Sequence, residues 1–167
     1  MRDPDDLLEA YVGGSALVDS NLLLLYLVGK CDPRIIPRFT RTQKYTVKDF
    51  ELLSKLLDRV FRTVLTTPNI LTEVSNLATK LPEHERRAFF AEMEKHIKIL
   101  DERYLPSSTA SRDRNYRTLG LTDAVVLNLS PGVLVLTDDL PLYSVIASRG
   151  HDVLNFTHLR VAAGTLQ

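Results

Sequence analysis

Several acidic side chains stand where apolar runs of the sequence end, and acids in such places can bind a metal ion or move a proton. Asp19 ends the first such run, and Asp138 and Asp139 follow a later one. Asp123 opens a predicted helix, and Glu73 lies one turn into another. An acid that ends a buried apolar strand is costly without partners, so Asp19 is the strongest candidate for a functional residue.

Carboxylates gathered within a few ångströms of one another repel, so they bind either protons or cations. Oxygen ligands of this kind suit Mg²⁺ or Mn²⁺. Zinc is not expected, because the four histidines show no ligand spacing and Cys31 has no second cysteine. One or two divalent ions can orient a water and stabilise the charge that grows on a phosphodiester.

Each acid also has an ordinary structural interpretation. Asp123 alone suits a helix N-cap, Asp139 alone suits a helix start, and Glu73 alone suits a solvated helix position. What favours an active site is that all four acids fall at equivalent ends of predicted elements.

The elements that must position these acids alternate between strands and helices. Among the predicted helices, one spans residues 50–64, and Thr122 and Asp123 are expected to cap another that ends at Leu129. Such alternation predicts an α/β fold with three layers, α/β/α, around a central and mainly parallel sheet. Parallel sheets bind ligands beyond the carboxyl ends of their strands, where the strand order reverses. The predicted strands are residues 15–19, 64–66, 97–100, 133–136 and 153–156.

Composition and length set the class of protein. The 167 residues fit one domain, residues 1–167, of which residues 1–15 form an N-terminal extension ahead of the first strand. Lys+Arg and Asp+Glu both total 21, so binding to nucleic acid would need a local basic patch. No apolar stretch is long enough to span a bilayer, and residues 1–6 lack a signal-peptide pattern, so no membrane association and a cytoplasmic location are expected.

Two stretches concentrate positive charge. Arg112, Arg114 and Arg117 surround Tyr116 shortly before Asp123, and we interpret them as the RNA-binding group. The second stretch interleaves cations with Phe39 and Tyr45, whose rings can stack on bases. A solvated loop explains either stretch equally well, and the second can instead contact a protein partner. Its cations are Lys30, Arg34, Arg38, Arg41, Lys44 and Lys48.

With these acids in order, the sequence resembles PIN-domain nucleases, especially the toxin ribonucleases of prokaryotic toxin–antitoxin pairs. That family opens with an aspartate on its first strand, followed by a glutamate in an apolar helix, an aspartate that opens a helix, and an acid after a strand that ends in threonine. The matching segments are Leu17-Val-Asp19-Ser-Asn21, Ile70-Leu-Thr-Glu73, Leu121-Thr-Asp123 and Thr137-Asp-Asp139.

The resemblance implies an Mg²⁺- or Mn²⁺-dependent endoribonuclease that acts on single-stranded or structured RNA. It makes Asp19, Glu73, Asp123 and Asp139 the catalytic, metal-binding residues. Asn21, Thr137 and Asp138 become supporting residues, and Asp139 is preferred to Asp138 because the family acid usually lies two residues past the threonine. An antitoxin protein and a second copy of the chain are the implied protein partners.

Two other functions stay open at this point. A PIN-like module that binds RNA or protein without cleaving it is the first alternative, although such a module has no physical reason to keep four mutually repelling carboxylates. A phospho-acceptor signalling domain is the second, suggested by Asp19 and the Asp138–Asp139 pair. Such a domain would need a lysine at the end of a late strand, and residues 153–156 contain none.

Overall fold

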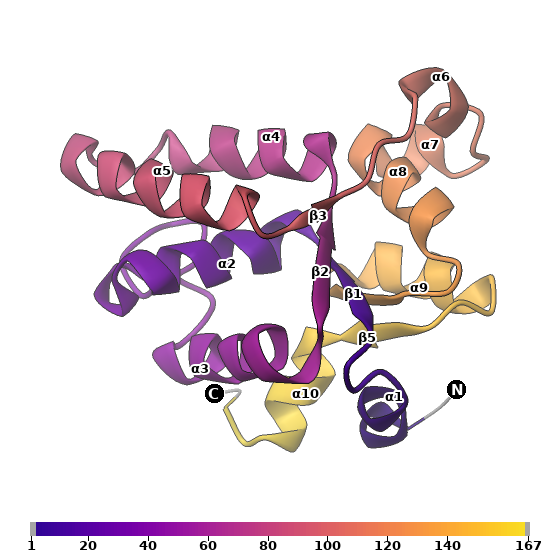
Figure 1. Cartoon of the computed structure of the whole chain (residues 1–167), viewed down its shortest axis with the longest axis horizontal. Helices are drawn as coiled ribbons and strands as arrows, with labels where there is room; N and C mark the ends of the chain where they lie inside the picture. The colour runs from indigo at the N-terminus through magenta and orange to yellow at the C-terminus, as the bar shows by residue number, and fades with distance from the viewer. Residues whose placement is uncertain (1–2, 166–167) are drawn as a thin grey trace.

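Five parallel strands form the central sheet of the computed structural model, which describes residues 3–165. Their order in the sheet is β3-β2-β1-β4-β5, and Leu17 of β1 lies opposite both Leu65 of β2 and Val135 of β4. Helices cover both faces of this sheet (Figure 1), which confirms the predicted three-layer α/β/α fold. The strands are β1 (Ser15–Val18), β2 (Thr63–Thr66), β3 (Asp101–Glu102), β4 (Leu134–Thr137) and β5 (Val153–Asn155).

The helices connect these strands and pack their apolar faces on the sheet. None of those in residues 3–165 has both the length and the apolar composition that a bilayer crossing requires. In chain order the helices are α1 (Pro4–Ala10), α2 (Ser20–Cys31), the 3₁₀ turn η1 (Pro33–Ile35), α3 (Val47–Lys55), the π-helical turn η2 (Leu56–Val60), α4 (Pro68–Ala78), α5 (Glu83–Ile97), α6 (Ser107–Ala110), α7 (Tyr116–Leu119), α8 (Leu121–Leu129), α9 (Leu140–Ser148) and α10 (Phe156–Ala162).

Helix α2 runs through the centre of the core, because its sequence is apolar on every side. Residues 22–25, all leucine, are at most 1% exposed. Gly29 lets α3 approach closely, since a Cβ atom at this position would lie 2.1 Å from the ring of Phe50. The helix starts directly after β1, so the residue between them, Asp19, is fixed by two largely buried elements.

Two predicted elements, a helix and the last strand, end earlier than the sequence indicated. The helix predicted over residues 50–64 ends earlier, at Lys55, and passes through η2 before β2 begins at Thr63. Pairing of Thr63–Leu65 with β1 requires an extended backbone there and overrides the helical periodicity. Phe156, predicted to end the last strand, instead begins α10, because the Asn155 side chain caps that helix by accepting a hydrogen bond from the Thr157 amide.

The prediction of a strand at residues 97–100 is wrong. Ile97 is the last residue of α5, and the amides of Ile99 and Leu100 donate to the carbonyl of His96 in a turn. The third strand is β3, which pairs with β2 through the charged residues Asp101 and Glu102.

The segment ahead of the first strand belongs to the same packed unit. Leu7 of α1 is 5% exposed in the core, and the Tyr11 hydroxyl donates to Asp152, which precedes β5, at 2.9 Å. The Gly13 amide donates to the carbonyl of Val60 at 2.7 Å. Residues 1–2 of the predicted extension lie outside the described residues.

Candidate active site

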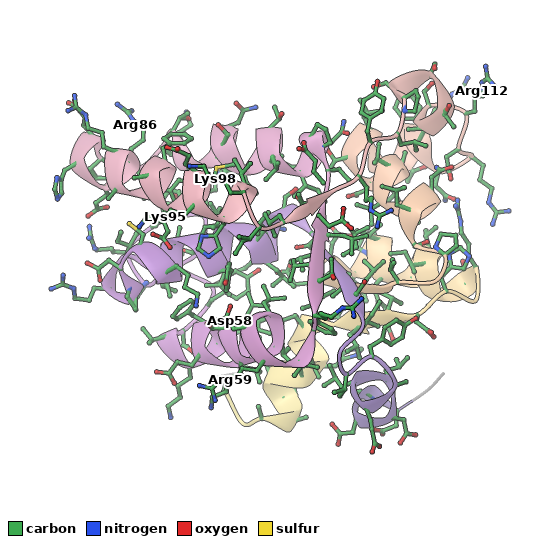
Figure 2. All side chains as sticks on the ribbon, viewed as in Figure 1. Asp58, Arg59, Arg86, Lys95, Lys98 and Arg112 are labelled. Carbon is green, nitrogen blue, oxygen red and sulfur yellow. The ribbon has the colours of Figure 1, made fainter. Side chains whose placement is uncertain are left out.

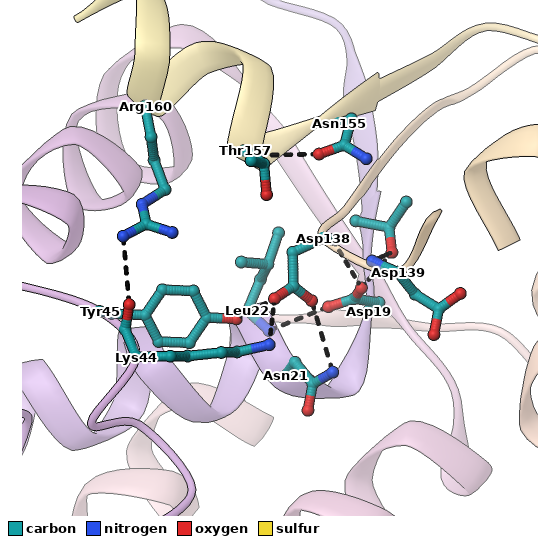
Figure 3. Close-up of polar contacts among 11 residues, drawn as sticks. Asp19, Asn21, Leu22, Lys44, Tyr45, Asp138, Asp139, Asn155, Thr157 and Arg160 are labelled. Atoms are coloured by element: carbon teal, nitrogen blue, oxygen red, sulfur yellow. Dashed lines mark hydrogen bonds and ion pairs between the residues drawn. The ribbon is translucent and has the colours of Figure 1, made fainter. Parts of the chain in front are cut away.

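The strand order reverses between β1 and β4, because the chain proceeds from β1 through β2 to β3 on one side and from β4 to β5 on the other. Ligand sites of open parallel sheets lie at such a point, beyond the carboxyl ends of the strands. Asp19 follows β1, and Asp138 and Asp139 follow β4, so these three acids meet at the reversal (Figure 3). Glu73 reaches the site from α4 and Asp123 from α8.

Asp19 is only 7% exposed and is held from three directions. One carboxylate oxygen accepts from the Leu22 amide at 2.9 Å, which caps α2. The other accepts from the Thr137 hydroxyl and from the Asp138 amide, the latter at 3.2 Å. Burial, and then the charge of Asp138, nevertheless raise the pKa of Asp19 to about 7.

Asp123 is half-buried in the first turn of α8. The prediction that it caps this helix is wrong, because the N-cap is Gly120, which adopts a φ of 89°. Burial, followed by the charges of Asp139 and Glu73, raises the pKa of Asp123 to about 7. Asp139 and Glu73 therefore lie close enough to Asp123 for their charges to oppose its ionisation.

Asp139 and Glu73 each have one defined partner. Asp139 caps α9 by accepting from the Leu142 amide at 2.8 Å, and its own amide donates to Thr137. Glu73 is exposed and accepts from the hydroxyl of Ser20 at 3.0 Å. The sequence did not single out Ser20, although its place directly after Asp19, at the start of a buried helix, is the one signal that was available.

Asp138 is engaged by three side chains. The Tyr45 hydroxyl and the Lys44 ammonium group both reach one of its oxygens, and the Asn21 amide donates to the other at 3.4 Å (Figure 3). The side chain of Asp138 is 5% exposed. Burial, together with the charge of Asp138, raises the pKa of Tyr45. Asp138 is thus already paired with a cation of the chain, Lys44, whereas Asp139 makes no ion pair within residues 3–165.

A buried ion pair holds the backbone that carries Lys44 and Tyr45. The guanidinium of Arg160 lies 2.9 Å from Asp49, which is fully buried. The same guanidinium donates to the carbonyl of Lys44 at 3.1 Å (Figure 3). Thr165 donates to the same carboxylate at 2.6 Å. Burial raises the pKa of Asp49, but the neighbouring guanidinium of Arg160 and the hydrogen bond from Thr165 outweigh it, and the pKa is lowered.

The predicted RNA-binding arginines, Arg112, Arg114 and Arg117, are all exposed. Figure 2 shows Arg112 projecting into solvent from the segment that carries them, residues 112–117. Arg149 of the α9 C-terminus anchors the segment through two hydrogen bonds to Asp113, at 2.7 and 2.9 Å. These bonds lower the pKa of Asp113. The ring of Tyr116 packs against the small apolar cluster around α8 and is half-buried.

The second basic stretch is engaged in contacts within the protein. Phe39 and Tyr45 are 6% and 2% exposed, so neither ring is free to stack on a base, contrary to the interpretation from sequence. Four of its six cations form ion pairs within the described residues: Lys30 with Asp58, Arg34 with Asp32, Arg38 with Glu85, and Lys44 with Asp138.

Burial and the charges of neighbouring acids oppose the ionisation of Asp19 and Asp123. A divalent cation would relieve this repulsion, so the chemistry of the site fits Mg²⁺ or Mn²⁺. In residues 3–165 no three acid, histidine or cysteine side chains already converge as a ligand group. Comparison of the sequence with models of protein families and with curated proteins found no match.

Proposed function

We propose that this chain is a metal-dependent endoribonuclease whose centre consists of Asp19, Glu73, Asp123 and Asp139. The observation that carries the proposal is the pair of carboxyl groups, Asp19 and Asp123, whose pKa values are raised to about 7 at the point where the strand order reverses. Perturbed acids at a ligand-binding edge of a sheet are typical of catalytic sites. Their resemblance in type and order to PIN-domain nucleases supports the same reaction.

The four acids would hold Mg²⁺ or Mn²⁺. When bound, such a cation offsets the charge of the phosphodiester and makes water more acidic at neutral pH. The chain's own residues prepare this site. Thr137 and the Leu22 amide fix the orientation of Asp19, and Ser20 does the same for Glu73. Asn21 and Lys44 hold Asp138 outside the ligand set.

The substrate we propose is single-stranded or structured RNA. The exposed Arg112, Arg114 and Arg117 supply charge that phosphates require, on a segment that leads into α8 and Asp123. From the resemblance to toxin ribonucleases we further propose an antitoxin protein and a second copy of the chain as partners. A lone cysteine, Cys31, favours the reducing cytoplasm as the location.

Substitution of Asp123 by asparagine tests the proposal, because it removes one charge without changing the shape of the side chain. We expect Asp123→Asn to lose RNA cleavage and to bind Mn²⁺ more weakly in a calorimetric titration. Glu94→Gln is the matched control, since Glu94 is an exposed acid of α5 that pairs only with Lys98 in the described chain. Cleavage by Asp123→Asn at the wild-type rate would remove Asp123 from the centre. Mn²⁺ binding without cleavage of any RNA or single-stranded DNA by the wild type would favour the non-catalytic module.

A further inference from the structure

An open groove lies between α4 and α8, next to the acidic centre. Its volume is about 450 Å³, within the range of small-molecule sites. Glu73 lines one part of it, and Thr122, the neighbour of Asp123, lines another. The groove is therefore continuous with the proposed site of hydrolysis.

Four polar residues of α4 line the groove, and only one of them, Glu73, is charged. Asn69, Thr72, Glu73 and Asn76 follow the spacing i, i+3, i+4, i+7, which places them on one face of the helix. Within residues 3–165, the side chains of Asn69, Thr72 and Asn76 make no hydrogen bond or ion pair with another residue. Their amide and hydroxyl groups are thus available to a ligand.

The remaining lining residues supply apolar contact. Pro68 and Leu77 are half-buried and border the same groove. A ligand that fits this combination has a flat apolar body and an edge with neighbouring hydrogen-bond donors and acceptors. Unpaired nucleobases have both, and side-chain amides pair with such edges through one donor and one acceptor.

We propose that this groove holds one unpaired RNA base beside the cleaved phosphate, with Asn69 and Asn76 reading its edge. This inference rests on the proposed function. It assigns the preference of the nuclease for particular RNA sequences to residues of α4. Phosphates are bound elsewhere, by the arginines before α8, so the groove itself needs no positive charge. A base in the groove would place the adjoining phosphate near Glu73 and Asp123.

The test measures binding without hydrolysis. Fluorescence anisotropy in EDTA would compare short labelled oligomers of adenylate, cytidylate and uridylate, using the wild type and the double variant Asn69→Leu with Asn76→Leu. We expect the wild type to prefer one oligomer by about tenfold, the discrimination that one paired amide contact provides. In the double variant this preference should disappear. The salt dependence should stay unchanged, because no charge is removed.

The control is His84→Leu, an exposed polar-to-apolar change on α5 outside the groove, which should keep the preference. Leucine has a higher helix propensity than asparagine, so α4 should persist in the variant. An unchanged preference in the double variant, equal loss of affinity for all three oligomers, or no preference in the wild type would each overturn the inference. EDTA prevents metal-dependent cleavage, so this assay measures binding alone. If the wild type shows a base preference but never cleaves RNA, the base-binding groove stands and only the nuclease function is refuted.

Discussion

Replacing Asp19 by asparagine should change the stability of the metal-free protein in a direction that depends on pH. The folded chain keeps the Asp19 proton up to a pH of about 7, whereas an unfolded chain loses it above 3.8. The native state therefore binds an extra proton between these two values. It follows that the free energy of unfolding of the wild type falls as the pH rises through this window.

The size of the effect follows from the contacts of Asp19. Its pKa lies about three units above the unfolded value, and each unit corresponds to about 1.4 kcal/mol, so ionising Asp19 costs the native state about 4 kcal/mol at pH 8. Asparagine avoids this cost and still caps α2. It leaves the Asp138 amide without its acceptor, which costs about 1 to 3 kcal/mol. The variant should thus be more stable than the wild type by about 1 to 3 kcal/mol at pH 8, and less stable by a similar amount at pH 4.

Urea unfolding in EDTA at a series of pH values measures this difference for both proteins. The same change at Glu94, Glu94→Gln, serves as the control. Lys98 lowers the pKa of this exposed acid, so the effect of Glu94→Gln on stability should be small and should change with pH in the opposite sense to that of Asp19→Asn. A difference between Asp19→Asn and wild type that is constant from pH 4 to pH 8 would refute the reasoning, since Asp19 would then have no raised pKa.

Three further predictions concern the residues that support the site. Replacing Arg114 and Arg117 together by alanine should weaken RNA binding and make the slope of log affinity against log salt shallower by about 1.4, or 0.7 for each lost phosphate contact; an identical slope would exclude this group from RNA binding. Asp49→Asn should lower the free energy of unfolding by about 3 to 5 kcal/mol in urea, because it leaves the buried Arg160 without a counter-ion, and a loss below about 1 kcal/mol would contradict the buried pair. Arg149→Met should speed tryptic cleavage of residues 112–117 at least tenfold with unchanged circular dichroism, because charge-assisted hydrogen bonds contribute about 1.5 to 3 kcal/mol. Equal cleavage rates would show that another contact holds these residues.

The strand ends were predictable because each apolar run stops at polar residues. β1 and β4 are almost entirely buried. Asp19 directly follows β1 and Thr137 ends β4, so composition alone marks the carboxyl ends of these strands. β3 could not be found in this way. It contains two charged residues and exists because their backbone pairs with β2.

The contacts that complete the site join residues far apart in the chain. Tyr45 and Lys44 reach Asp138 across more than ninety positions, and Ser20 reaches Glu73 across 53. Local periodicity in the sequence cannot predict such pairs. The sequence therefore indicated only a basic loop, where the structure places Lys44 as the counter-ion of Asp138. The same long-range packing buries Phe39 and Tyr45, which the sequence had offered as stacking surfaces.

The most direct test of the central claim is an assay with labelled single-stranded RNA and the pure protein, in Mg²⁺, in Mn²⁺ and in EDTA, beside Asp19→Asn prepared in the same way. We expect the wild type to cleave the RNA in the presence of a divalent cation only, and Asp19→Asn to remain folded without cleaving it. Cleavage that persists in EDTA, or that Asp19→Asn performs as fast as the wild type, would contradict a metal-dependent centre built on these acids.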